Sequence, residues 1–138
     1  TFQGFRAVDH IIPPQAPPQG GMSEVSEVIP AAVFTVPELA SVGMTEEQLK
    51  AQGVEFRTLK GYYRSNGRAL ANDCTDGLLK LLVSPDDHIL ACHALGSHAA
   101  DIVQEATALI SLNATLSEVR GIVHIHPTLS EVLQDAAL

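Results

Sequence analysis

Two histidines near the C-terminus, His124 and His126, are the residues whose types and spacing could do chemistry. On a strand they would share one face, because side chains two residues apart point the same way, and two imidazoles can begin a metal site. A closed site needs two more ligands, for which His93, His98 and Glu131 are the candidates. Nothing in the sequence brings these residues together, and we predict no metal site.

A second chemistry would pair His126 with Glu131, five residues further along the chain. Pro127 restricts the backbone at the histidine and permits a cis peptide bond at modest cost, so the imidazole could lie in a defined turn before a helix. A carboxylate within reach would accept a hydrogen bond from one ring nitrogen, fix the tautomer and leave the other nitrogen as a base. On this hypothesis the two side chains form an oriented acid–base dyad.

A purely structural role for Glu131 is also open. The residues Thr-Leu-Ser-Glu-Val occur twice, at 115–119 and 128–132, and each copy predicts a capping box that opens a short helix. Glu118 takes the corresponding place in the first copy, which has no histidine or proline directly ahead of it. Capping accounts for the first copy by itself, so the histidine and proline are the additional feature of the second.

The strands expected around these residues follow from runs of β-branched and apolar side chains. Residues 29–36 and 39–44 indicate two strands or one bent strand, and the partial alternation of residues 54–63 indicates another. Residues 77–83 and 88–95 are apolar runs on either side of a Ser-Pro-Asp-Asp turn. That arrangement is typical of a β-hairpin.

The expected helices begin at capping residues. A capping box from Thr45 predicts a helix over 46–51, and Ser97 is the expected cap of a helix over 97–112 that has one apolar face. Residues 65–72 could form a short helix or a loop. The order of all these elements predicts an α+β fold, in which helices cover an antiparallel sheet of about four or five strands.

The composition excludes several classes of protein. With 138 residues, of which 46% are hydrophobic and 17% charged, the chain can bury a core and is not an intrinsically disordered chain. The net charge of −8 opposes binding to nucleic acid and to anionic membrane surfaces. No apolar run approaches the roughly 20 residues of a membrane span, and we expect a soluble, cytoplasmic protein. Cys74 and Cys92 are far apart in the sequence, so we expect free thiols.

Three segments are expected along the chain. Residues 13–27 are rich in proline and glycine, which predicts a linker. Residues 1–12 are too few to form a domain, and residues 28–138 are expected to form the one compact domain. No glycine-rich phosphate loop follows any predicted strand, so we do not expect this chain to bind a dinucleotide by itself.

Four segments carry a resemblance to a known family: residues 29–43, 77–81, 89–96 and 124–131. They resemble the C-terminal dimerisation domain of the FAD-dependent pyridine nucleotide-disulfide oxidoreductases. Within this family the chain is most similar to the dihydrolipoamide dehydrogenase branch, with the mercuric and glutathione reductase branches as alternatives. The resemblance covers about residues 28–138. Residues 2–11 are more weakly similar to the segment just after the flavin-contacting part, which implies that residues 1–12 are a remnant of the preceding flavin-binding region.

The resemblance implies a parent enzyme that is a homodimer, binds FAD and NAD in domains ahead of this one, and oxidises the dihydrolipoyl groups of 2-oxo acid dehydrogenase complexes. It implies that His126 is the base that deprotonates a substrate thiol near the partner subunit's disulfide, and that Glu131 is its orienting carboxylate. His124 and Pro127 are implied as supporting residues. The chain alone is then expected to hold no cofactor and to be inactive. The alternative is a noncatalytic module that only associates with itself.

Overall fold

The computed structural model describes residues 4, 7–8, 11–12 and 28–138. The predicted linker at residues 13–27 lies outside the described residues, as does most of the predicted remnant at residues 1–12. The strands and helices considered below all lie within residues 28–138.

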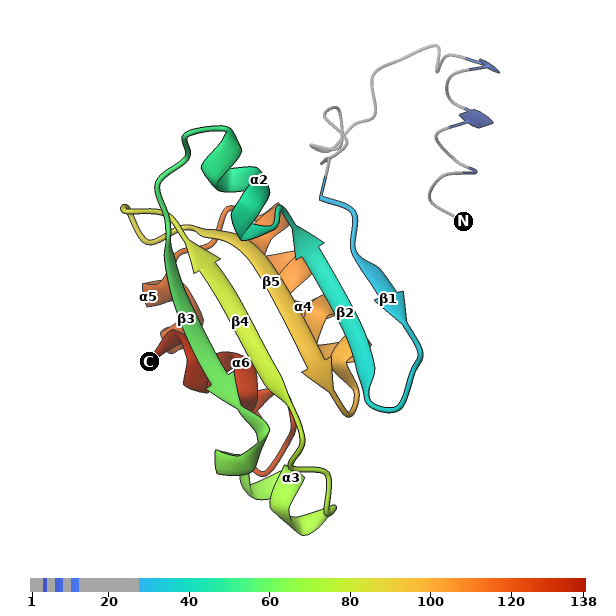
Figure 1. The fold of residues 1–138 in the computed structure, drawn as a ribbon, viewed down its shortest axis with the longest axis vertical. Helices are drawn as coiled ribbons and strands as arrows, with labels where there is room; N and C mark the ends of the chain where they lie inside the picture. Colours follow the sequence, from blue (N-terminus) through green and yellow to red (C-terminus); the bar gives the residue numbers. More distant parts are fainter. Residues whose placement is uncertain (1–3, 5–6, 9–10, 13–27) are drawn as a thin grey trace.

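Five strands form one antiparallel sheet in the order β1-β2-β5-β4-β3 (Figure 1). They are β1 (Ala31–Val33), β2 (Glu38–Gly43), β3 (Arg57–Tyr62), β4 (Leu78–Val83) and β5 (Ile89–Gly96). β4 and β5 are the predicted hairpin, in which Leu81 pairs with Cys92. The antiparallel sheet with its helices confirms the predicted α+β fold class.

The first predicted strand region is divided in two by its prolines. Pro30 and Pro37 have no backbone N–H to donate to a sheet, so β1 begins after the first and β2 after the second. β1 is only three residues long and pairs with β2 at the edge of the sheet. The two strands therefore confirm the divided form of the prediction, with a shorter first strand than the pattern indicated.

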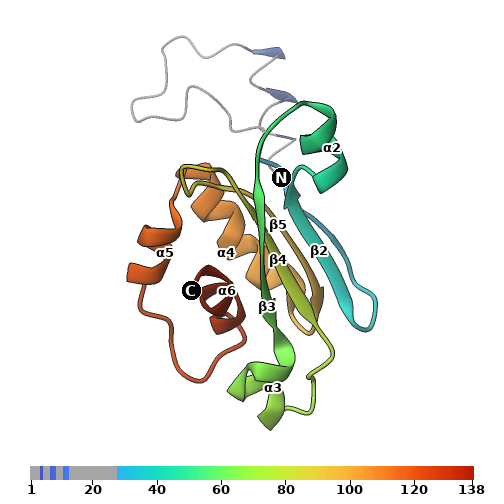
Figure 2. The same ribbon diagram turned by 60° about the vertical axis from the view of Figure 1, so that its left-hand side comes forward.

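Five α-helices accompany the sheet within residues 28–138. They are α2 (Glu46–Ala51), α3 (Gly67–Ala71), α4 (Ala99–Ser111), α5 (Leu116–Gly121) and α6 (Glu131–Ala137). α4 and α6 pack on one face of the sheet, with α5 beside α6 (Figure 2). α2 covers one end of the other face, where its Leu49 packs with Leu82 and Ala91. The predicted capping box at the start of α2, formed by Thr45 and Gln48, is confirmed.

The start of α4 differs from the prediction that Ser97 caps it. The N-cap residue is His98, which has φ 56° in the left-handed region and makes no side-chain cap bond. The carboxylate of Glu38 on β2 instead accepts a hydrogen bond from the backbone N–H of Ala100 at 3.2 Å. A side chain 62 residues away thus satisfies a donor at the helix N-terminus, which a local sequence pattern cannot reveal.

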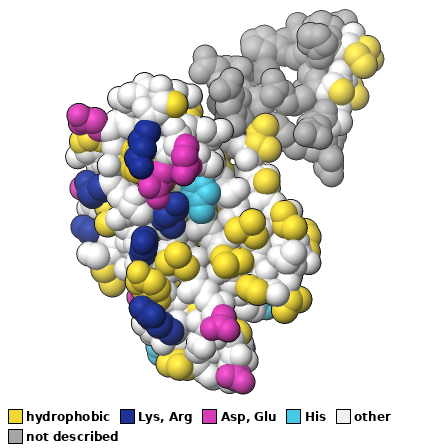
Figure 3. All heavy atoms as spheres, viewed as in Figure 1, with side chains coloured by type: hydrophobic (Ala, Val, Ile, Leu, Met, Phe, Trp, Pro, Cys, Tyr) yellow, Lys and Arg dark blue, Asp and Glu magenta, His cyan; other side chains and the backbone are white. Residues whose placement is uncertain are grey.

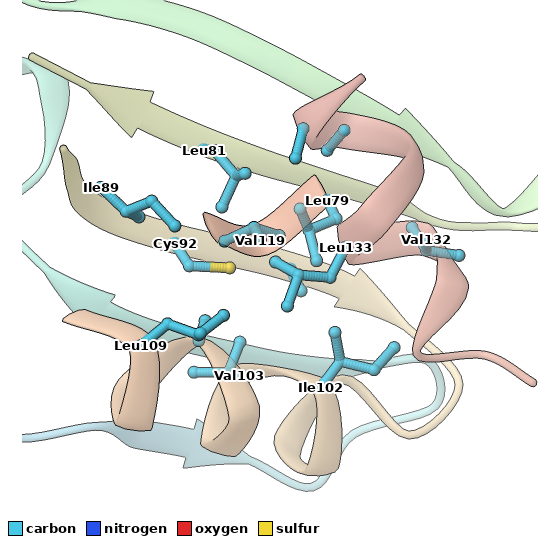
Figure 4. Packing of buried hydrophobic residues seen from close by; sticks show 14 of the residues in the cluster. Leu79, Leu81, Ile89, Cys92, Ile102, Val103, Leu109, Val119, Val132 and Leu133 are labelled. Atoms are coloured by element: carbon cyan, nitrogen blue, oxygen red, sulfur yellow. The ribbon is translucent and has the colours of Figure 1, made fainter. Parts of the chain in front are cut away.

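The hydrophobic core lies between the sheet and the helices α4 and α6 (Figure 4). The buried residues in Figure 4 include Leu79, Leu81, Cys92, Ile102, Val103, Val119, Val132 and Leu133. Burial raises the pKa of the Cys92 thiol to about 12, so this thiol is a structural group rather than a nucleophile at neutral pH. Both cysteines are free, as the sequence predicted.

α6 rests directly on the backbone of β3. A Cβ atom added at Gly61 would lie 2.2 Å from the carbonyl oxygen of Val132, which is far inside contact distance. Only glycine permits this close approach of helix and strand. The contact fixes the first turn of α6, and with it Glu131, relative to the sheet.

Candidate functional site

Residues 122–130, which we call the histidine segment, join α5 to α6 without forming a helix or strand of their own. The segment carries His124 and His126, and its His126–Pro127 peptide bond is cis. Side chains of α4 and α6 and the residue preceding α3 make hydrogen bonds to it. Three elements that are separate in the sequence therefore hold the segment that carries the two histidines.

The structure brings His126 and Glu131 together. Nδ1 of His126 lies 2.9 Å from Oε1 of Glu131, and the other carboxylate oxygen accepts a hydrogen bond from the backbone N–H of Thr128 at 2.7 Å. The hydrogen bonds from Thr128 and then from His126 hold the pKa of Glu131 below its ordinary value. Because a carboxylate only accepts, Nδ1 of His126 carries the proton of this bond, and Nε2 is the nitrogen left to act as a base.

The two side chains differ greatly in exposure. The His126 side chain is 79% exposed, whereas that of Glu131 is 19% exposed. The carboxylate is held to the backbone by the N–H of Thr128, while the imidazole that it binds stands out from the surface. An oriented ring with one nitrogen open to an incoming group is the geometry that proton transfer requires.

The predicted capping box of Thr128 and Glu131 is only half formed. Glu131 accepts from the Thr128 N–H, but α6 begins at Glu131 itself, and the preceding Ser130 makes no side-chain cap bond. The Thr128 hydroxyl is buried and has no hydrogen-bond partner. The first copy forms the complete box, with Thr115 and Glu118 bonded in both directions. The copies differ because residues 129–130 turn before the helix starts, so the backbone N–H of Glu131 does not bond to the Thr128 hydroxyl. The Glu131 carboxylate binds His126 in addition to the Thr128 N–H.

His124 is anchored rather than open. Its Nε2 lies 2.8 Å from Oε1 of Glu105 on α4, and its side chain is only 4% exposed. The ring therefore ties the histidine segment to α4 two residues before His126. This position fits a supporting role and leaves His124 little access to a substrate.

The metal site considered from the sequence has no counterpart among the described residues. No group of three or more His, Cys, Asp and Glu side chains in this part of the chain could hold a metal ion. His98 pairs with Asp101 at 3.1 Å, and His93 lies on β5, where burial is the main cause that lowers its pKa. These histidines therefore lie in different parts of the fold and do not converge on one metal site.

Sequence reasoning missed two residues of the site, Asn66 and Glu105. The Asn66 side chain precedes α3 and donates from Nδ2 to the Thr128 carbonyl at 2.9 Å. Glu105 lies within α4 and binds His124. Asn66 stands before a glycine in a polar stretch, a pattern that indicates a helix cap, but no pattern in the sequence joins it to a carbonyl 62 residues away.

The sheet face opposite α4 and α6 carries a row of apolar side chains across its strands. In pairing order these are Val33, Leu39, Leu95, Leu78 and Tyr62. All except Leu78 are substantially exposed, and Figure 3 shows hydrophobic side chains gathered over this face. Contiguous exposed apolar surface of this kind marks sites of association.

No helix of the described residues is both long and apolar enough to cross a bilayer.

Comparison with known proteins places these features in a family context. The model of the family described as pyridine nucleotide-disulphide oxidoreductase, dimerisation domain, matches residues 29–137. Dihydrolipoyl dehydrogenase 1, mitochondrial, of Arabidopsis thaliana is 41% identical over 111 residues, which are 80% of this chain and 22% of that protein. Dihydrolipoyl dehydrogenase of Synechocystis is 41% identical over 140 residues, covering 97% of this chain and 28% of that protein. The chain thus spans about a quarter of the length of these relatives.

Solved structures show the same fold. RclA from Escherichia coli, described as a HOCl-induced flavoprotein disulfide reductase, matches with a TM-score of 0.84 at 24% identity, over 98% of this chain and 31% of that one. LpdA from Mycobacterium tuberculosis matches with a TM-score of 0.83 at 24% identity, over 99% of this chain and 29% of that one. At this identity the likeness concerns the fold.

Proposed function

Because the chain belongs to the pyridine nucleotide-disulphide oxidoreductases, which it matches over their dimerisation domain, we propose that it is the dimerisation domain of a dihydrolipoyl dehydrogenase. Support comes from the relatives of that name at about 40% identity. The parent enzyme would oxidise dihydrolipoamide with NAD, and its partners would be the dihydrolipoyl groups of 2-oxo acid dehydrogenase complexes. A cytoplasmic location stays a prediction, since several relatives are named as mitochondrial.

The role proposed for His126 is that of the base toward a dihydrolipoyl thiol. A thiol with a pKa near about 8.5 is a poor nucleophile until it loses its proton. The proton would pass from sulfur to Nε2 of His126, and the thiolate would attack one sulfur of the partner subunit's disulfide, whose S–S bond breaks as the mixed disulfide forms. Glu131 would stabilise the resulting imidazolium through Nδ1. The observation that carries this proposal is the 2.9 Å bond from an exposed ring to a largely buried carboxylate.

The described residues do not fit a dinucleotide site. Their sheet is antiparallel, and in residues 28–138 no glycine-rich turn leads from a strand into a helix with the spacing that phosphate binding requires. We therefore place FAD and NAD in the other domains of the parent enzyme, where they would supply the electron transfer to nicotinamide. The steps assigned to this chain are limited to proton transfer by His126 and to the orientation of its ring by Glu131.

Association with a second copy is the other part of the proposed function. The domain would bring its histidine segment to the partner subunit, so that each active site draws on both chains. The exposed apolar side chains of the sheet face and of the histidine segment, such as Ile125 at 80% exposure, support such an association. Turnover of a His126→Gln variant of the full-length enzyme tests the catalytic part, and sedimentation tests the association.

A further inference from the structure

His126 receives little support from packing, because most of its side chain is exposed. Its orientation therefore depends on its hydrogen bond to Glu131 and on the backbone between them. Thr128 lies in the middle of that backbone, and its N–H is bonded to Glu131. Whatever holds Thr128 in place also holds the dyad in place.

Thr128 is not held through its own side chain. Its hydroxyl is buried without a hydrogen-bond partner. Its carbonyl, however, accepts the hydrogen bond from Nδ2 of Asn66. The backbone groups on both sides of Thr128 are thus fixed, one by Glu131 and one by Asn66.

The side chain of Asn66 is held in one orientation by its hydrogen bonds. The residue is only 2% exposed, and its Oδ1 accepts from the backbone N–H groups of Arg68 and Ala69 at 3.0 and 2.9 Å. One amide therefore caps α3 with its oxygen and holds Thr128 with its nitrogen. Because a buried amide that loses a partner is costly, the two functions fix each other's geometry.

We propose that Asn66 is a positioning residue for the His126–Glu131 pair, acting through the carbonyl of Thr128. The hydrogen bonds run from α3 through Asn66 and Thr128 to Glu131 and then to the ring of His126. The inference rests on the proposed function of His126, but the structural link can be measured without turnover.

The test is the ring tautomer of His126, read from imidazole nitrogen chemical shifts in the 138-residue chain at alkaline pH, where an imidazole is neutral. In the unmodified chain the bond to Glu131 favours the Nδ1–H tautomer. Asn66→Asp keeps the oxygen that caps α3 and removes the N–H group that holds Thr128. We expect the ratio of the Nδ1–H to the Nε2–H tautomer to fall about fivefold, as loss of a net hydrogen bond implies, while the ring of His124 is unchanged.

Thr45→Ala is the control, because it removes the cap of α2 at the other end of the sheet and should leave the His126 tautomer unchanged. Should the aspartate variant fail to fold, Asn66→Ser also caps and also lacks the amide, and it gives the same readout. A folded Asn66→Asp or Asn66→Ser chain with the tautomer ratio of the unmodified chain would overturn the proposal. Full turnover in a His126→Gln enzyme would contradict the proposed function instead, so the two failures are distinguishable.

Discussion

Glu131 and Glu118 occupy the same place in two identical five-residue segments, and only Glu131 binds a histidine ring. Both carboxylates accept from the backbone N–H of the threonine three residues earlier. Glu118 adds the hydroxyl of Thr115, whereas Glu131 adds Nδ1 of His126. The chain therefore contains its own control for the difference between a capping carboxylate and an orienting one.

Glutamine at each position should separate the two roles. In the full-length enzyme, Glu131→Gln should lower the rate of dihydrolipoamide oxidation, because it removes the charge that stabilises the imidazolium. The loss should be smaller than that of His126→Gln, since the ring remains. Glu118→Gln should leave the rate intact and cost only a little thermal stability. Equal rate losses at the two positions would show that Glu131 is only a cap.

The lowered pKa of Glu131 predicts a pH dependence of stability. The folded chain holds this pKa below the ordinary value of 4.5, so the ionised carboxylate favours folding above that pH. The contribution is lost as the pH falls through the folded-state value. Urea unfolding of the unmodified chain and of Glu131→Gln should therefore show a stability difference at pH 6 to 7 that shrinks below about pH 4. A difference that does not change with pH would be inconsistent with the hydrogen bonds described.

The buried and exposed imidazole–carboxylate pairs should differ in their effect on stability. Glu105→Ala leaves the buried ring of His124 without its partner and should lower the free energy of unfolding by about 1–2 kcal/mol. Asp101→Ala removes the partner of His98. Because the side chains of Asp101 and His98 are both well exposed, this substitution should change the free energy of unfolding little. Chemical denaturation of both variants gives the comparison. Equal effects would argue that Glu105 does not anchor the histidine segment.

Self-association should be measurable in this chain alone. Sedimentation velocity at high micromolar concentration should show a concentration-dependent dimer, weaker than that of a full-length enzyme because the interface is smaller. Ile125→Ser, beside His126, should weaken the dimer several-fold, whereas Val54→Ser, placed after α2, should not. A monomer at all concentrations would argue against association through this domain alone.

The parts of the fold that could be predicted are those whose partners are close in sequence. The capping box of Thr45 and Gln48 joins residues three apart, and the hairpin of β4 and β5 joins adjacent strands. The sequence pattern therefore contained both, and the antiparallel fold class followed from their order. The cap of α4 was missed because it comes from Glu38, 62 residues away.

The same distinction applies to the candidate site. His126 and Glu131 are five residues apart, so their pairing could be predicted from the turn that Pro127 makes ahead of a helix. Asn66 and Glu105 reach the histidine segment from 62 and 19 residues away, and only the packed sheet and helices bring them there. The predicted box at Thr128 forms only in part, because residues 129–130 turn before α6 begins and the Thr128 hydroxyl is left without the backbone N–H of Glu131 that a full box requires.

The role of His126 is tested most directly by the rate of dihydrolipoamide oxidation in a full-length enzyme that carries His126→Gln. Loss of the base should lower this rate about 100- to 10,000-fold, the usual contribution of a general base, with far smaller loss toward artificial electron acceptors that need no thiol deprotonation. His98→Gln is the matched control, because His98 is also an exposed ring bonded to a carboxylate, and it should keep the full rate. A His126→Gln enzyme with near-normal dihydrolipoamide turnover would contradict the assignment of His126 as the base.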